Sequence, residues 1–136
     1  MTGGVVSDNA GGGAPADGTH LLRELLQVNA PSTCFGFMVD PEVARQAHEA
    51  GTGATIAIRL GGRSDELHGA PIEASAYVKC LTDGRFRYTT PMGAGGEENL
   101  GPMARFIIGR ISRCIVGWIS PRASRAASVA ASAPRS

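Results

Sequence analysis

The stretch TCFGFMVDPEVARQAHEAGTGATIAIRL, residues 33–60, holds two apolar runs with a helical pattern between them. The first run, Thr33 to Val39, is short and continuously apolar, which predicts a strand buried on both faces. Asp40 and Pro41 suit the cap and the first position of a helix. A second apolar strand is expected over Ala54 to Leu60. Two strands joined by a helix favour a parallel pair in an α/β fold.

A second amphipathic helix is expected on the N-terminal side of this unit. Apolar residues recur there at helical spacing: Leu21, Leu22, Leu25 and Leu26. Asp17 or Thr19 would cap this helix, because short oxygen-bearing side chains satisfy the free N–H groups of a first turn. The helix is expected to end near Pro31.

Beyond residue 60 the pattern becomes that of strands. Ile72 to Leu81 alternates, Asp83-Gly84 is a two-residue hairpin signal, and Arg85 to Tyr88 alternates again. Arg105 to Ile108 reads as one more strand. The fold class that follows is α/β, a small mixed sheet with two packed helices and a β-hairpin.

The charge divides the chain in two, although its formal net value is only +1. Residues 1–109 carry −4, whereas residues 110–136 hold five arginines and no acidic residue. We therefore expect a domain over 1–109 and a divergent, low-complexity tail over 110–136. From Ile119 the tail is rich in Ser, Ala, Arg and Pro, which predicts a disordered C-terminal tail.

Composition also restricts location and partners. The small net charge predicts neither a nucleic-acid nor an anionic-membrane partner, and no run approaches the ~20 apolar residues of a membrane helix. Cys34, Cys80 and Cys114 are widely spaced and form no metal-binding or disulfide pattern. We expect a cytoplasmic protein with reduced, mostly buried cysteines.

The stretch SDNAGGGAPADGTH, residues 7–20, is a candidate functional loop. A phosphate cradle is disfavoured, because a P-loop ends in Gly-Lys-Ser/Thr and this loop continues Gly13-Ala14-Pro15. Asp8 is a hard oxygen ligand for a metal, and the glycines permit close approach of the backbone. One carboxylate is nevertheless too few ligands for a zinc site.

The three histidines share no metal-binding spacing. His48 on the predicted helix and His68 in a glycine-rich turn are interpreted as exposed side chains. His20, next to the glycine loop, stays a candidate. Taken alone, the chain is expected to lack a complete metal site, and no GxSxG elbow or activated cysteine is visible.

Three segments together resemble a known family: SDNAGGGAPADGT, VDPEVARQAHEAGTGATIAIRLGG and ENLGPMARF. Their order resembles the C-terminal domain of MlrC-like (microcystinase C-type) zinc metallopeptidases over roughly residues 5–109. The resemblance implies a two-domain enzyme that hydrolyses linearised microcystin-type peptides. Its partners would be an N-terminal metal-binding domain and a peptide substrate.

The resemblance also implies roles for the loop. Zinc would be held largely by the N-terminal domain, and no zinc is expected to bind tightly to this chain alone. Asp8 would face the metal. The residues expected to line the cleft or the substrate site are Asn9, Gly11, Gly12, Gly13 and His20.

After residue 109 the resemblance is lost, and the Arg/Ser/Ala/Pro composition is typical of an out-of-frame reading of a GC-rich gene. The leading hypothesis is therefore a C-terminal fragment, inactive without the metal domain, whose sheet edge beside Arg105–Ile108 is left open. One alternative is a stand-alone, non-catalytic binding or interaction module of the same fold. Another is a small hydrolase that uses Asp8 with His20.

Overall fold

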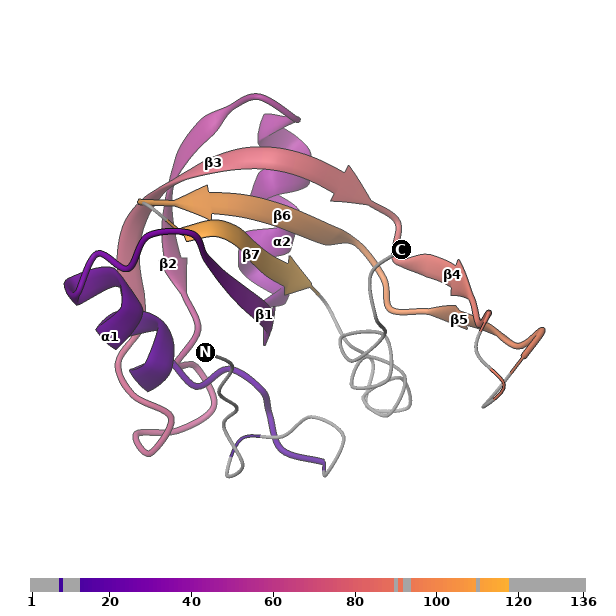
Figure 1. The fold of residues 1–136 in the computed structure, drawn as a ribbon, viewed down its shortest axis with the longest axis horizontal. Coiled ribbons are helices and arrows are strands. Elements are labelled where there is room, and N and C mark those ends of the chain that lie inside the picture. Colours follow the sequence, from indigo (N-terminus) through magenta and orange to yellow (C-terminus); the bar gives the residue numbers. More distant parts are fainter. Residues whose placement is uncertain (1–7, 9–12, 90, 92–93, 110, 118–136) are drawn as a thin grey trace.

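The structure, a computed structural model, describes residues 8, 13–89, 91, 94–109 and 111–117. Two helices and seven strands lie in these parts of the chain (Figure 1). In chain order they are α1 (His20–Gln27), β1 (Thr33–Val39), α2 (Pro41–Ala50), β2 (Thr55–Leu60), β3 (Ile72–Thr82), β4 (Arg85–Arg87), β5 (Glu97–Asn99), β6 (Met103–Ile108) and β7 (Ile111–Gly117). The α/β class and the mixed sheet with two helices are confirmed.

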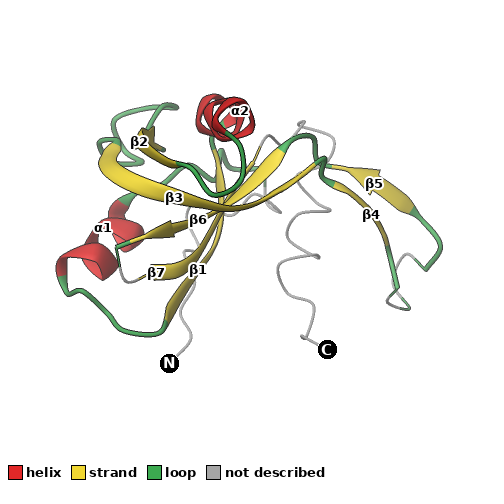
Figure 2. Cartoon of the chain, turned by 90° about the horizontal axis from the view of Figure 1, so that it is seen from above, coloured by secondary structure: helices red, strands yellow, loops and turns green. Residues whose placement is uncertain are grey.

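Five of the strands form one sheet in the order β1-β7-β6-β3-β2. Neighbouring strands are antiparallel except β1 and β7, which are parallel. The prediction that β1 and β2 form a parallel pair is wrong, since they lie at opposite edges of the sheet. Helix α2 crosses one face and carries the chain between those edges, as Figures 1 and 2 show.

Strand β7 lies inside the sheet, hydrogen-bonded to β6 on one side and to β1 on the other. In its register Cys114 is opposite both Phe106 of β6 and Phe35 of β1. The expectation of an open edge beside Arg105–Ile108 is therefore wrong. The apolar segment after residue 110 supplies the strand that joins β1 to the rest of the sheet.

The Asp83-Gly84 turn does not make the hairpin expected of it. Strands β3 and β4 are not paired with each other; β4 pairs with β5 in a separate two-stranded ribbon. The Asp83 side chain accepts the Arg85 N–H at 3.0 Å, and the Gly84 carbonyl accepts the Leu100 N–H at 2.9 Å. The turn thus redirects the chain out of the main sheet, and the observed β-hairpin is β4–β5.

The two helices begin differently. Asp40 caps α2 by accepting the Val43 N–H at 3.1 Å, with Pro41 in the first turn, as predicted. Thr19 is the N-cap residue of α1, but its side chain makes no capping hydrogen bond. The prediction of a side-chain cap from Asp17 or Thr19 is wrong because both side chains bind the loop between β2 and β3 instead.

The core lies between the sheet and the helices. α2 packs on β7, β2, β6 and β3. Fully buried side chains come from both helices and five strands: Leu22, Met38, Val43, Leu60, Val78, Phe106, Ile108 and Ile111. Only Met38 of β1 is buried, so the prediction of a strand covered on both faces is wrong. An edge position explains this exposure.

The remaining predictions concern the termini, the cysteines and the membrane. The expected disordered tail over 119–136 lies outside the described residues. Cys34 and Cys80 are exposed, which contradicts their predicted burial. Within the described part of the chain, neither helix is long and apolar enough to cross a membrane.

Candidate functional site

Asp8 braces the loop that precedes α1. Its two carboxylate oxygens accept the backbone N–H groups of Ala16 at 2.7 Å and Gly18 at 2.6 Å. Gly18 is required there, because a Cβ at that position would lie 2.8 Å from Asp8 Oδ2. The carboxylate thus ties Asp8 to the backbone just before α1. A carboxylate has about four lone-pair positions, so Asp8 keeps capacity for a further partner.

Asp17 anchors the same loop to the segment between β2 and β3. Its side chain is buried, and Oδ2 accepts hydrogen bonds from the Arg63 N–H, the Ser64 N–H and the Ser64 hydroxyl at 2.8–2.9 Å. Its main-chain carbonyl accepts the Gly62 N–H at 2.7 Å. Oδ1 is also buried and has no hydrogen-bond partner among the described residues. One oxygen of this carboxylate is saturated while the other is unsatisfied.

His68 lies in the β2–β3 loop, and its two ring nitrogens face Asp65 and Asp8. Its Nδ1 lies 2.6 Å from Asp65 Oδ1, and its Nε2 lies 3.3 Å from Asp8 Oδ1. The hydrogen bond with Asp65 raises the pKa of His68, and the charges of Asp65, Asp8 and Asp17 act in the same direction. The same hydrogen bond lowers the pKa of Asp65. The imidazole therefore sits in a strongly negative environment.

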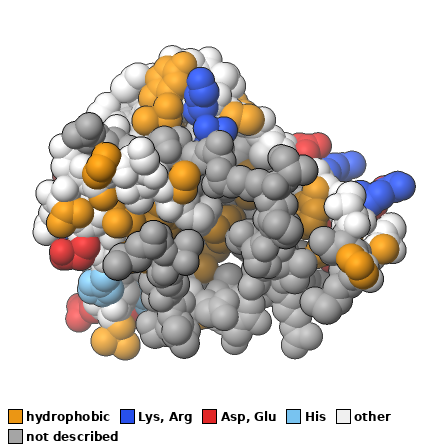
Figure 3. Space-filling model, in the orientation of Figure 1, with side chains coloured by type: hydrophobic (Ala, Val, Ile, Leu, Met, Phe, Trp, Pro, Cys, Tyr) orange, Lys and Arg blue, Asp and Glu red, His pale blue; other side chains and the backbone are white. Residues whose placement is uncertain are grey.

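Asp8, Asp17 and His68 together form what we call the loop cluster. Each offers one potential ligand atom, and these atoms all lie within 4.8 Å of one another. Figure 3 shows histidine and acidic side chains side by side at the end of the molecule where the β2–β3 loop lies. The interpretation of His68 as an exposed turn residue is wrong, because only 16% of its side chain is accessible.

Backbone contacts hold the two loops of the cluster in place. The Thr19 N–H donates to the His68 carbonyl at 2.8 Å, and the Thr19 hydroxyl donates to the Ala70 carbonyl at 2.8 Å. The Val39 N–H at the end of β1 donates to the Ala16 carbonyl. Both loops are thereby fixed to the same end of the sheet.

The other residues predicted for the site either lie apart from the loop cluster or fall outside the residues that the structure describes. His20 is exposed, and its Nε2 lies 3.0 Å from the Leu67 carbonyl oxygen rather than at Asp8. Gly13 is exposed with φ 91°, and a Cβ there would meet nothing within 4 Å. Asn9, Gly11 and Gly12 lie outside the described residues. Their roles stay predictions.

Asp40 links the loop cluster to the helix. Its fully buried carboxylate caps α2 and also accepts the Gly61 N–H at 2.9 Å and the Arg63 Nε–H at 3.0 Å. Arg63 is the residue whose main-chain N–H binds Asp17. The end of β2, the start of α2 and the loop that contains Asp17 are therefore joined at the turn that contains Gly61 and Arg63.

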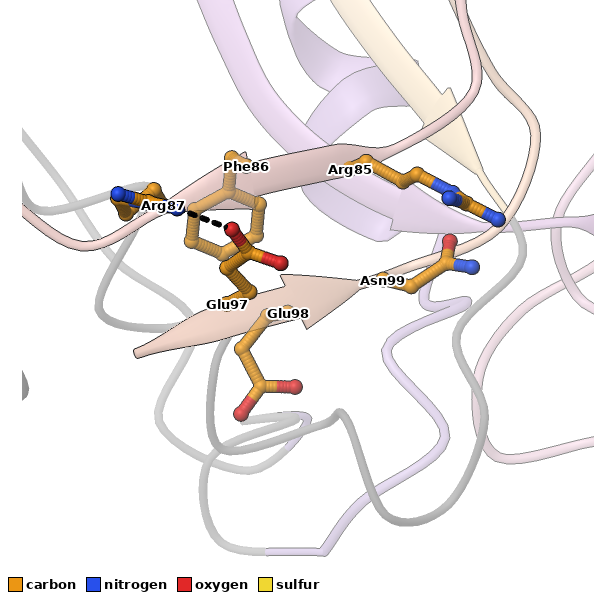
Figure 4. A pocket seen from close by; sticks show the side chains of 6 residues that line it. All are labelled: Arg85, Phe86, Arg87, Glu97, Glu98 and Asn99. Carbon is orange, nitrogen blue, oxygen red and sulfur yellow. Dashed lines mark hydrogen bonds and ion pairs between the residues drawn. The ribbon is translucent and has the colours of Figure 1, made fainter. Parts of the chain in front are cut away.

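A pocket of about 440 Å³ lies on the β4–β5 ribbon, away from these loops (Figure 4). It is lined by Arg85, Phe86, Arg87, Glu97, Glu98 and Asn99. Arg87 and Glu97 pair across the ribbon at 2.5 Å, with both side chains 68% exposed. The opposite charges of Arg87 and Glu97 compensate each other, and both side chains are exposed to solvent. This pocket therefore lacks the converging, buried polar groups of the loop cluster.

Comparison with known proteins identifies the family. The family described as MlrC C-terminus matches residues 6–121, which include every element of the sheet. The chain belongs to this family. The match extends through β7 and so past the point where the sequence resemblance was expected to end; the division of the chain at residue 109 stays a prediction.

Two relatives of the MlrC C-terminal domain are informative. Microcystinase C of Sphingomonas sp is 35% identical over 77 residues, which is 57% of this chain and 15% of the relative. A crystal structure from Mesorhizobium sp. BNC1, provisionally described as a metallopeptidase, is 30% identical with a TM-score of 0.66. The alignment covers 79% of this chain and 22% of that one. The MlrC C-terminal domain thus spans only a small part of each relative.

The sequence pattern could have revealed part of the loop cluster. The resemblance implies a role for Asp8, whereas no sequence motif marks Asp17 or His68 as a site residue. Asp17 resembled a helix cap, and His68 lies fifty-one residues further along the chain, with no motif to connect them. Only the hydrogen bonds between the two loops bring these residues together.

Proposed function

We propose that this chain is the C-terminal part of a zinc-dependent metallopeptidase that hydrolyses linearised microcystin-type or related peptides. The observation that carries the proposal is the family match over residues 6–121, together with the relationship to Microcystinase C. Because the chain spans 15% and 22% of the relatives, the rest of the catalytic apparatus is assigned to an N-terminal domain. The chain alone is expected to be inactive.

The role that we assign to this domain is to present the aspartate and glycine loop to the peptide. Asp8 holds the base of that loop through two short hydrogen bonds, and Asp17 fixes it to the β2–β3 loop. A segment whose backbone is already fixed by such hydrogen bonds loses little conformational freedom when a substrate binds, which favours binding. The proposal places Asn9, Gly11, Gly12, Gly13 and His20 along the cleft.

Zinc is the metal implied by the family resemblance. When bound, it supplies polarisation of the scissile carbonyl group and activation of a water molecule. Asp8 is the residue of this chain that the resemblance directs toward the metal. The residues of the domain otherwise act by positioning the loop.

A chimaeric enzyme tests this proposal. In Microcystinase C, the segment matched by this chain would be replaced by residues 6–121, and hydrolysis of a linear peptide would be followed by chromatography. We expect the chimaera to cleave the peptide and the chain alone to leave it intact. Asp8→Asn in the chimaera should lower kcat/KM, whereas the matched control Asp83→Asn, in an exposed turn, should not.

Two results would contradict the proposal. One is a folded chimaera that fails to cleave a peptide which Microcystinase C itself cleaves; that result would favour a non-catalytic binding module. The other is hydrolysis by the isolated chain at the rate of the chimaera, which would favour an independent hydrolase.

A further inference from the structure

The loop cluster gathers several carboxylates around one imidazole. Asp8 and Asp65 both contact the ring of His68, and Asp17 offers a potential ligand atom within 4.8 Å of it. Asp17 is only 3% exposed, so its carboxylate gains little from solvent. Buried carboxylates are stable only when hydrogen bonds or a cation compensate their charge. Compensation of Asp17 is incomplete.

The unsatisfied oxygen of Asp17 is the decisive feature. Three donors satisfy Oδ2, whereas Oδ1 is buried and has no hydrogen-bond partner among the described residues. A buried oxygen of this kind destabilises the folded chain if nothing binds it, because its lost hydration is not compensated. Asp17 also offers a potential ligand atom within 4.8 Å of those of Asp8 and His68. The Asp17 carboxylate therefore has an oxygen with free lone pairs, and Asp8 and His68 are close enough to bind the same metal ion.

The orientation of His68 has the form found around bound metals. Asp65 Oδ1 lies 2.6 Å from Nδ1, and the same oxygen accepts the backbone N–H groups of Leu67 and His68 at 2.8 and 3.0 Å. A carboxylate held in this way fixes the ring and accepts the Nδ1 proton, which leaves Nε2 as the ligand atom. Nε2 points to Asp8, with 3.3 Å between it and Oδ1.

We propose that Asp8, Asp17 and His68 form a site for a divalent transition-metal ion, with Asp65 as the residue that positions His68. One imidazole nitrogen and two carboxylate oxygens suit zinc, while calcium and magnesium prefer oxygen ligands alone. Three protein ligands leave one position of a tetrahedral ion for water or a substrate group. The site would join Asp8 and Asp17 to the β2–β3 loop that carries His68.

This site revises the expectation that the isolated chain binds no zinc tightly. That expectation counted one carboxylate, whereas folding brings together three ligands that come from two loops. The inference depends only on side chains of this chain, so it can hold even if the chimaeric peptidase is inactive. The competing occupant is a proton on His68, which would neutralise the same charges without a metal.

Calorimetry on the whole 136-residue chain, with ZnCl₂ as the probe at pH 7.5, tests the site. We expect one saturable zinc per chain and a higher unfolding midpoint in the presence of zinc. His68→Ala and Asp17→Asn should each weaken zinc binding by at least about tenfold, and Asp65→Asn by about tenfold. His48→Ala is the matched control, because His48 lies on α2 and its Nε2 contacts the Met103 carbonyl oxygen instead.

Asp17→Asn should fold, since the amide oxygen can accept the three hydrogen bonds now made by Oδ2. Circular dichroism of each variant with and without zinc checks this. A chain that folds only after zinc is added would support the site. The proposal is overturned if the parent chain binds no zinc, if it binds calcium more tightly than zinc, or if Asp17→Asn, His68→Ala and His48→Ala bind zinc equally. A chain unfolded with and without zinc would also overturn it.

Discussion

At the scale of single residues, the site depends on backbone positions where no side chain fits. Gly62 has φ 58°, and a Cβ there would lie 2.2 Å from the Gly69 carbonyl oxygen. Its N–H donates to the Asp17 carbonyl at 2.7 Å. Gly62 therefore permits the close approach between the start and the end of the β2–β3 loop, which carries His68.

Gly62→Ala should destabilise the protein by about 3 kcal/mol or more, because positive-φ strain and a clash with backbone act together. Gly53→Ala is the matched control: Gly53 has φ 93°, but a Cβ there would meet nothing within 4 Å. The control should lose only about 1 kcal/mol from backbone strain. Urea denaturation measures both values, and equal losses would show that the contact with Gly69 is not limiting.

At the scale of elements, helix α2 is the best-specified part of the chain. Asp40 caps it, Pro41 begins it, and Gly51 ends it with φ 85°. An exposed ion-pair network lies along it, in which Arg45 binds both Glu42 and Glu49. Local sequence thus sets both ends of this helix, while Asp40 also fixes it to the turn after β2.

The first turn of α2 gives a pH-dependent prediction. Hydrogen bonds from Arg45 and then Gln46 lower the pKa of Glu42 from 4.5 to about 2. Because the folded pKa is below the unfolded value, the contribution of Glu42 to stability is present above pH 4.5 and is lost as the pH falls through about 2. The pair is half-exposed, so this contribution is small and decreases with added salt.

NMR titration of the Glu42 carboxyl carbon measures this pKa directly. We expect a midpoint of about 2 in the parent chain and a distinctly higher midpoint in Arg45→Ala, still below 4.5 because the Gln46 hydrogen bond remains. Arg59→Ala, which removes an arginine from the exposed side of β2 instead of from α2, serves as the control and should leave the Glu42 midpoint unchanged. A normal midpoint in the parent chain would show that the Arg45 contacts do not persist in solution.

At the scale of the whole molecule, strand β7 decides whether the sheet is complete. It is the only strand in the described structure that pairs with β1, and it also pairs with β6. Ile111 at its start is buried in the core with Phe106 and Ile108. Without β7, strand β1 would lose its hydrogen-bonded connection to the sheet.

A chain that ends at residue 109 should therefore lose cooperative unfolding, because removal of an interior strand exposes core side chains and leaves two unpaired edges. A chain that ends at residue 117 keeps β7 and is the matched control, for which we expect a cooperative transition. Thermal unfolding followed by circular dichroism compares them. An unchanged midpoint in the shorter chain would mean that β7 is dispensable.

The sequence by itself determined the local structure. The cap, proline and glycine of α2 act through contacts between near neighbours. The apolar runs of β1 and β2 are visible in the sequence itself, and the predicted bounds of all three elements agree closely with the structure. The order of the three segments that resemble the MlrC family, the Asp8 loop among them, also indicates the family without any tertiary structure.

Only the tertiary structure decided which strands pair and which side chains meet. The parallel partner of β1 is β7, more than seventy residues away, and the Asp83-Gly84 turn leads out of the sheet instead of folding it back. The loop cluster has the same origin: Asp17 and His68 meet because Thr19 and Gly62 donate hydrogen bonds between two distant loops. Periodicity describes the faces of single elements, whereas pairing and site assembly depend on the free energy of packing the whole core.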